Sequence, residues 1–149
     1  MPEYEGYIVT NYLFFNLAGP EPFAIPVCSV REIVTISEIH KLPGSSDMIV
    51  GCMNVRGVVI PVIDLPSMLF SRPTPLLEGM VIILDLPNQS CGFKVSGVKS
   101  ISKLDVGVVE RSATAKHFVN GVSTQEDGTI VQILNVDKIL ARIAQRNVA

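Results

Sequence analysis

Short runs of apolar and β-branched residues, separated by glycine, proline and asparagine, are the dominant pattern of this 149-residue chain. Such runs suit strands with one or both faces packed, while glycine and proline between them favour turns. The segments 18–22 and 40–48 are therefore expected to be a turn and a loop. The pattern predicts strands over residues 7–17, 23–27, 29–36, 48–55, 58–65, 80–86, 91–95, 119–124 and 129–134.

The most distinct predicted hairpin joins residues 48–55 to residues 58–65, with Arg56 near its tip. Asn54 at the first position and Gly57 at the fourth fit a type I turn closed by a glycine bulge. Pro61 has no backbone donor, so the returning strand is expected to lie at a sheet edge or to contain a bulge.

Two further hairpins are expected, with turns at residues 87–90 and 125–128. Between the first and second hairpins, the proline-containing segment 71–75 is predicted to be a stiff connector. It is the best candidate in the sequence for a boundary between two sub-domains.

One helix is predicted near the C-terminus. Val136, Ile139, Leu140 and Ile143 recur at the spacing that places side chains on one helical face. Asn135 can cap the start of this helix. A short helical turn over residues 66–70 is a further expectation.

Many short strands with turns between them predict an all-β fold, either a barrel or a sandwich, followed by the C-terminal helix. The length favours a single domain, 1–149, that can bury a core without disulfides or metals. A hydrophobic content of 48% with 17% charged residues is typical of a globular chain rather than a disordered one.

The charge pattern excludes several classes of protein. The net charge is −2 and no run is rich in lysine and arginine, so the electrostatic footprint of a nucleic-acid binder is missing. No apolar stretch reaches the roughly 20 residues that span a bilayer, and the acidic N-terminus lacks the basic region of a signal peptide. Cys28, Cys52 and Cys91 are odd in number and widely spaced, so they are expected to be buried and reduced in a cytoplasmic protein.

Residues that could support catalysis are scattered along the chain. His40 and His117 lie in polar segments without the spacing of a metal site or a triad, and are expected to be solvated. Asp64 is expected to end a strand and bond nearby backbone amides. The pattern predicts no cofactor, no metal and no enzymatic activity. Carboxylates can still pair in space, so a small β-barrel hydrolase stays an alternative, as does an oligonucleotide-binding barrel.

Arg56 is the charged residue that a core explains least, because it lies among apolar residues and glycine. A guanidinium with five donors suits a partner surface or an ion pair, and Glu32 is the natural candidate partner within the chain. An ordinary turn arginine is an equally good interpretation at this point.

Several segments together resemble the CheW-like domain family over nearly the whole chain, from about Tyr7 to Leu140. The longest and most specific of them is Gly51-Cys52-Met53-Asn54-Val55-Arg56-Gly57-Val58-Val59-Ile60-Pro61-Val62-Ile63-Asp64-Leu65. Shorter supporting segments are Phe23-Ala24-Ile25-Pro26-Val27, Val30-Arg31-Glu32-Ile33, Leu42-Pro43-Gly44, Val95-Ser96-Gly97-Val98 and Ile133-Leu134-Asn135-Val136-Asp137-Lys138-Ile139-Leu140.

The resemblance implies two five-stranded SH3-like β-barrels that share a hydrophobic core, with a groove between them. It also implies a non-catalytic cytoplasmic adaptor of chemotaxis, recruited to receptor arrays at the inner face of the membrane. Its partners would be the regulatory domain of the histidine kinase CheA and the cytoplasmic tip of chemoreceptors. The implied receptor-binding residues are Val30, Gly51, Arg56, Gly57 and Val98, with Glu32 orienting Arg56; the kinase-facing surface has no comparable motif.

Two positions depart from the family pattern. Ser96 and Asn135 stand where aspartate is frequent, which leaves the identity of the kinase and the receptor open. An adaptor of a paralogous pathway, such as twitching or gliding motility, is therefore the main alternative.

Overall fold

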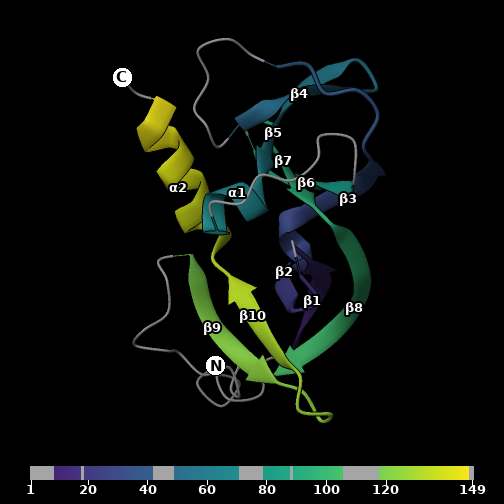
Figure 1. Cartoon of the computed structure of the whole chain (residues 1–149), viewed down its shortest axis with the longest axis vertical. Coiled ribbons are helices and arrows are strands. Elements are labelled where there is room, and N and C mark those ends of the chain that lie inside the picture. The colour runs from purple at the N-terminus through teal and green to yellow at the C-terminus, as the bar shows by residue number, and fades with distance from the viewer. Residues whose placement is uncertain are drawn as a thin grey trace.

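The computed structural model describes residues 9–17, 19–41, 49–70, 79–87, 89–105 and 118–147. In this part of the chain, ten strands form two five-stranded sheets, which lie one above the other in Figure 1. Sheet A contains, in spatial order, β8 (Gly97–Asp105), β1 (Val9–Asn16), β2 (Pro22–Pro26), β10 (Ile130–Leu134) and β9 (Val119–Thr124). Sheet B contains β3 (Val30–Thr35), β6 (Met80–Leu84), β7 (Gly92–Val95), β5 (Val58–Asp64) and β4 (Ile49–Val55).

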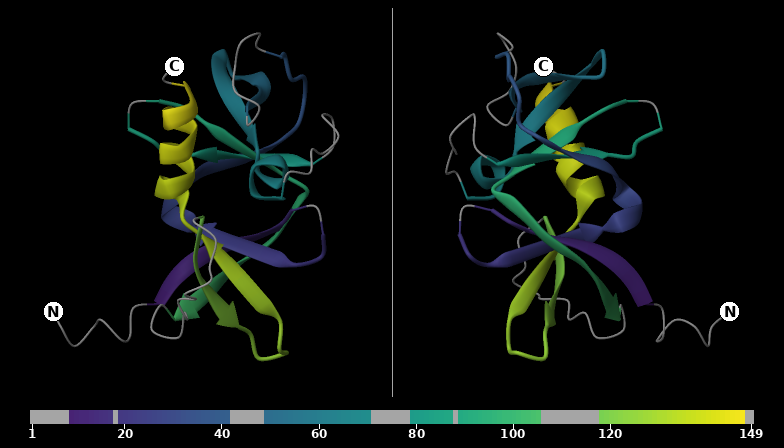
Figure 2. Two further views of the ribbon diagram at one scale, coloured as in Figure 1. Left: turned by 60° about the vertical axis from the view of Figure 1, so that its left-hand side comes forward. Right: turned by 90° about the vertical axis from the view of Figure 1, so that its right-hand side faces the viewer.

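The chain path interleaves the two sheets. It forms β1 and β2 of sheet A, crosses through a short 3₁₀ turn at Val27–Ser29, completes all five strands of sheet B and returns at Ser96. Figure 2 shows the two sheets as separate layers in two further views. The predicted connector 71–75 lies outside the described residues. The elements on both sides of it belong to the sheet B segment, so the chain crosses between the sheets elsewhere.

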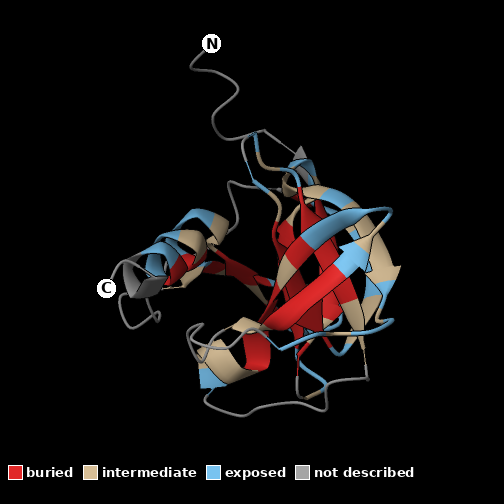
Figure 3. Ribbon diagram, turned by 90° about the horizontal axis from the view of Figure 1, so that it is seen from above, coloured by how far each residue is buried: buried red, intermediate tan, exposed pale blue. Residues whose placement is uncertain are grey.

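The core explains why the strands read as almost continuous apolar runs. Along β1, Tyr12 and Phe14 point into a cluster inside sheet A, while Leu13 and Phe15 point into a central cluster shared by both sheets. A strand with both faces buried needs apolar residues at every position. Sheet B likewise encloses its own cluster, consisting of Met53, Ile60, Val62, Val81 and Ile83. The two predicted five-stranded units with a shared core are thus confirmed, and Figure 3 shows the buried strands at the centre.

The helices follow the predicted pattern. The short α1 (Leu65–Phe70) covers the expected helical turn, and α2 (Val136–Asn147) begins directly after Asn135. The side-chain oxygen of Asn135 accepts a hydrogen bond from the backbone N–H of Lys138 at 3.0 Å, which is the geometry of an N-cap. Ile139 and Ile143 are buried in the central cluster, so α2 closes this core on one side.

Strand β8 was not predicted from the sequence. Its apolar residues Val98, Ile101 and Leu104 recur at every third position, which matches no strand pattern. The structure supplies the reason: Phe15 of β1 pairs with Val98 and Phe14 with Ser100, so Lys99 is an extra residue in the ladder. Such a bulge shifts the alternation of side chains along an edge strand.

The expectation for Pro61 was wrong, because β5 is an interior strand and not an edge, and the bulge of this hairpin lies in β4, between Ile49 and Gly51. Cys52, which lies opposite Pro61, exchanges both backbone hydrogen bonds with His40 on the other side of β4, at 2.7 and 2.8 Å. Cys52 and Pro61 therefore form a pair without hydrogen bonds between them, and the proline nitrogen points away from β4. The missing donor therefore removes no bond of the β4–β5 ladder. On the other side of β5, pairing with β7 begins only at the next residue, Val62.

Candidate functional site

The tip of the β4–β5 hairpin has a tighter turn than predicted. Val55 pairs directly with Val58, so only Arg56 and Gly57 form the loop, and both have positive φ angles, 51° and 84°. Two central residues with positive φ are characteristic of a type I′ turn, which replaces the expected type I turn with a bulge. Asn54 stabilises the turn by accepting a hydrogen bond from the N–H of Gly57 at 2.9 Å. The hairpin register thus forces a non-glycine residue into the left-handed region, at a cost of roughly 1–2 kcal/mol.

Arg56 is held at this tip by Glu32. The guanidinium donates a hydrogen bond to Glu32 and forms an ion pair with it. Glu32 lies on β3 and its side chain is only 25% exposed, whereas the side chain of Arg56 is 72% exposed. β3 and β4 are the two ends of sheet B, so the ion pair joins opposite edges of a curled sheet. An exposed pair of this kind contributes about 0–1 kcal/mol to stability, and its main effect is to fix the direction of the guanidinium.

Gly51 has a structural reason to be glycine. It is buried in β4, and a Cβ atom at this position would lie 2.4 Å from the backbone oxygen of His40. Glycine therefore allows the segment before β4 to approach closely enough for the bridge between His40 and Cys52. A receptor contact at Gly51 stays a prediction, and it would involve backbone atoms only, because glycine has no side chain.

Val30 and Val98 lie where the chain passes between the sheets. Val30 starts β3 after the 3₁₀ turn, and Val98 is the second residue of β8 after the return at Ser96. Both side chains are partly buried and pack against the central cluster, so each has one apolar side left toward solvent. Their receptor role is likewise a prediction.

The structure thus arranges the predicted residues other than Gly51 in two groups. Glu32, Arg56 and Gly57 form one end of sheet B, where a fixed cation faces solvent. Val30 and Val98 lie at the seam between the sheets, beside the central cluster. The two groups are linked through β3, since Val30 is two residues before Glu32 on the same strand.

Val58 and Val59 are surface residues that the sequence did not single out. They are 51% and 62% exposed, at the start of β5 and directly after the turn with Arg56. They precede Val62, the first residue of β5 that pairs with β7, so within the described ranges no third strand pairs with this part of the hairpin. In the sequence they belong to an apolar run that looks like core, and only the offset between β5 and β7 shows that they are exposed.

The described residues offer little for catalysis. No three of their His, Cys, Asp and Glu side chains lie close enough to hold a metal ion. His40 is exposed, with its Nε2 atom 3.9 Å from a carboxylate oxygen of Glu38, while His117 lies outside the described residues. Asp64 is the last residue of β5 and is buried, directly before α1, as expected for a strand end; its predicted bonds to backbone amides stay a prediction.

The cysteines differ from expectation at one position. Cys52 and Cys91 are buried, as predicted, but Cys28 in the 3₁₀ turn is exposed. This turn joins β2 to β3 at the surface of the molecule, and its three residues include no buried one. Burial raises the pKa of the Cys91 thiol to about 12.

These exposures predict the order in which the thiols react. At pH 8 an alkylating reagent such as iodoacetamide should modify Cys28 first, because the thiol of Cys28 is exposed to the reagent. Cys91 should stay unmodified until the protein unfolds, since its raised pKa leaves almost no thiolate below pH 10. Mass spectrometry of partially labelled protein measures this order, and the variant Cys28→Ser is the control. Rapid labelling of Cys91 in the folded protein would contradict the buried position.

No helix among the described residues is long and apolar enough to span a membrane.

Comparisons with known proteins agree on one family. The model of the CheW-like domain matches residues 11–144. The chemotaxis protein CheW of Klebsiella aerogenes is 24% identical over 137 residues, which cover 88% of this chain and 81% of the relative. A probable chemotaxis protein CheW of Rhizobium etli is 31% identical over 110 residues, 70% of this chain and 71% of the relative. The crystal structure of the scaffolding protein TtCheW from Thermoanaerobacter tengcongensis superposes with a TM-score of 0.74 at 26% identity, covering 87% of this chain and 86% of that one.

Proposed function

The chain belongs to the CheW-like domain family, and on this premise we propose that it is a chemotaxis coupling adaptor that places a histidine kinase under the control of chemoreceptors. It acts by binding both partners and not by catalysis. The partners are the regulatory domain of a CheA-type kinase and the cytoplasmic tip of a receptor, so the adaptor works in the cytoplasm beside the receptor array.

The observation that supports this proposal most directly is the fixed guanidinium of Arg56. It is mostly exposed, it lies at the tip of a short hairpin, and Glu32 sets its direction. A cation fixed in this way loses little side-chain freedom when a partner binds, which is the advantage of a pre-organised contact. Charges of this kind give register and specificity to an interface more than they give affinity.

Apolar burial would come from the valines around it. Val30 and Val98 provide half-buried apolar surface at the seam between the sheets, and Gly57 lets a partner approach the tip closely. A receptor surface through these residues buries roughly 1,000–1,600 Å², which is typical of exchangeable contacts near micromolar affinity, about −8 kcal/mol. Repetition of such weak contacts in an array gives strong assembly through effective concentration.

The chemotaxis pathway is favoured over a paralogous one because the relatives reported above are named for chemotaxis. The exposed valines and the fixed guanidinium of Arg56 also suit a protein partner better than a small-molecule substrate.

A pull-down with both partners tests the proposal. The wild-type chain should capture a receptor tip fragment and the kinase regulatory domain together. Val98→Asp should weaken receptor capture by at least about tenfold, because it places a charge in apolar surface that the receptor would cover. Kinase capture by the same variant should be unchanged, which also shows that the variant is folded.

Ile101→Asp is the matched control, since Ile101 is on the same strand, is 61% exposed and is not a predicted contact. It should bind the receptor like the wild type. Undiminished receptor capture by Val98→Asp would remove Val98 from the interface, and failure of the wild type to capture either partner would refute the adaptor role.

A further inference from the structure

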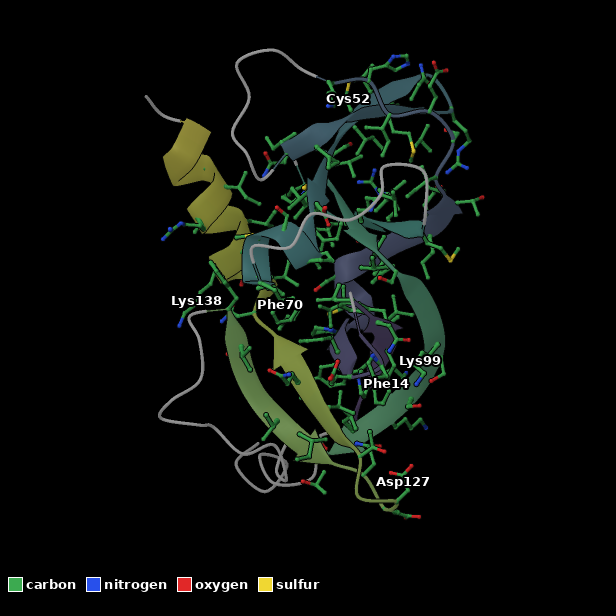
Figure 4. The ribbon with its side chains drawn as sticks, in the orientation of Figure 1. Phe14, Cys52, Phe70, Lys99, Asp127 and Lys138 are labelled. Atoms are coloured by element: carbon green, nitrogen blue, oxygen red, sulfur yellow. The ribbon has the colours of Figure 1, made fainter. Side chains whose placement is uncertain are left out.

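Sheet A contains a hollow of about 500 Å³ at the end where the β9–β10 turn lies. One wall is β8, the opposite wall is the β9–β10 turn, and Phe14 and Val131 form the floor. Figure 4 shows Phe14, Lys99 and Asp127 in the lower half of the molecule, around this part of sheet A. None of the residues of the proposed receptor surface lines it.

The hollow exists because small side chains occupy inward positions of sheet A. Ser100 and Ser102 lie on the same side of β8 as Leu104, whose side chain belongs to the cluster inside the sheet. Ala24 is part of that cluster as well, and Ser123 is buried nearby on β9. The corresponding cluster inside sheet B consists of valine, isoleucine and methionine. Ser100 and Ser102, which line the hollow, fill less volume than these residues would, so this end of sheet A stays open.

Opposite charges line the two walls. The bulge in β8 brings Lys99 to the hollow, and Glu126 and Asp127 lie across from it on the β9–β10 turn. Asp127 is held in place because its carboxylate accepts a hydrogen bond from the N–H of Thr129 at 2.9 Å. That bond lowers the pKa of Asp127, and Lys99 lowers it further by a smaller amount. Among the described residues Lys99 has no ion-pair partner within 4 Å, so the charges face each other without direct pairing.

We propose that this hollow binds a small zwitterion of amino-acid to dipeptide size. The carboxylate of the ligand would lie at Lys99, its ammonium group at Asp127 and Glu126, and its apolar side chain on Phe14 and Val131. A ligand with one charge would leave the charged side chains of one wall without a partner. An uncharged ligand would leave the charged side chains of both walls without a partner. The volume falls within the 300–1,000 Å³ of small-molecule sites, which occur in the mouths of β-barrels. This role is separate from the adaptor function.

Titration of the isotope-labelled protein with the dipeptide alanyl-leucine, followed by NMR, tests the proposal. Shift changes should concentrate at the residues of the hollow and give a dissociation constant. N-acetyl-alanyl-leucine, which lacks the ammonium group, and alanyl-leucinamide, which lacks the carboxylate, should each bind at least about tenfold more weakly, since each loses one charge-assisted contact.

Variants of Lys99 and Asp127 test which charged group of the ligand each side chain binds. Lys99→Met should weaken alanyl-leucine binding at least tenfold but should not weaken the amide further, because the amide has no carboxylate to lose. Asp127→Asn keeps an acceptor for the N–H of Thr129 and should show the reverse selectivity, with no further loss for the acetylated dipeptide. Lys103→Met, on the exposed side of the same strand, is the matched control and should bind like the wild type.

Three outcomes would overturn the proposal. They are the absence of shift changes at the hollow up to the solubility limit, equal binding of the zwitterion and its two blocked forms, and unchanged binding by a folded Lys99→Met. Receptor and kinase capture by Lys99→Met should equal that of the wild type, so failure of the zwitterion site and failure of the adaptor function give different results.

Discussion

Replacement of Phe93 by alanine should lower the free energy of unfolding by about 3–5 kcal/mol. Phe93 lies on β7 with its side chain fully buried in the central cluster, where residues from both sheets and from α2 meet. Removal of the ring leaves a cavity that the surrounding strands can fill only in part. Thermal unfolding should show a midpoint lower by roughly 10 °C or more in a protein of this size, and the midpoint of urea unfolding should move to a lower urea concentration.

Phe70→Ala is the control for this prediction, because Phe70 is partly exposed at the end of α1 and should cost much less. The shape of the transition is also informative. Since the central cluster joins both sheets, Phe93→Ala should still unfold in one step, as expected for the single domain 1–149. Two separate transitions, with sheet A unaffected, would show that the sheets are independent domains.

Replacement of Arg56 by glycine should reduce receptor binding by tenfold or more while leaving the protein as stable as the wild type. Glycine adopts the positive φ of this turn without strain, and this gain offsets the lost ion pair with Glu32, worth about 0–1 kcal/mol. Binding loses a pre-organised cation of the proposed surface, and a tenfold loss of affinity corresponds to about 1.4 kcal/mol. Titration calorimetry with a receptor tip fragment and a thermal melt measure the two effects.

Three further variants separate charge from geometry. Arg56→Lys keeps the charge without the planar fork and should bind with intermediate affinity. Glu32→Gln leaves the guanidinium in place without its ionic partner and should weaken binding less than Arg56→Gly. Arg31→Ala, an exposed arginine on β3 that pairs with Asp85, is the matched control and should bind normally. Full receptor binding by Arg56→Gly would remove Arg56 from the interface.

Local patterns in the sequence predict most of the elements correctly. The hairpins β4–β5, β6–β7 and β9–β10 follow from apolar runs beside turn residues, and α2 follows from the spacing of Val136, Ile139, Leu140 and Ile143. These signals depend only on neighbouring residues, so a single sequence contains them. Strand β8 was missed because its bulge at Lys99 is defined by the partner strand β1, which is distant in sequence.

The sequence likewise predicts only part of the candidate site. The sequence identifies Arg56 as a charged residue in an apolar context and proposes Glu32 as its partner, and the structure places the two in contact. It does not reveal the left-handed conformation of Arg56 or the exposure of Val58 and Val59. Those features depend on the pairing of Val55 with Val58 and on the point where β7 joins β5.

The sequence by itself therefore determined the strand-rich class, the hairpins, the capped helix and the family, because alternation, turn chemistry and capping act over a few residues. The tertiary structure decided which sheet each strand joins, how Lys99 comes to line the hollow in sheet A, and how Glu32 on β3 meets Arg56 on the hairpin. These arrangements arise when strands that are far apart in the chain pair and bury a common core. The free energy that selects them comes from contacts between distant residues, so no local pattern encodes them.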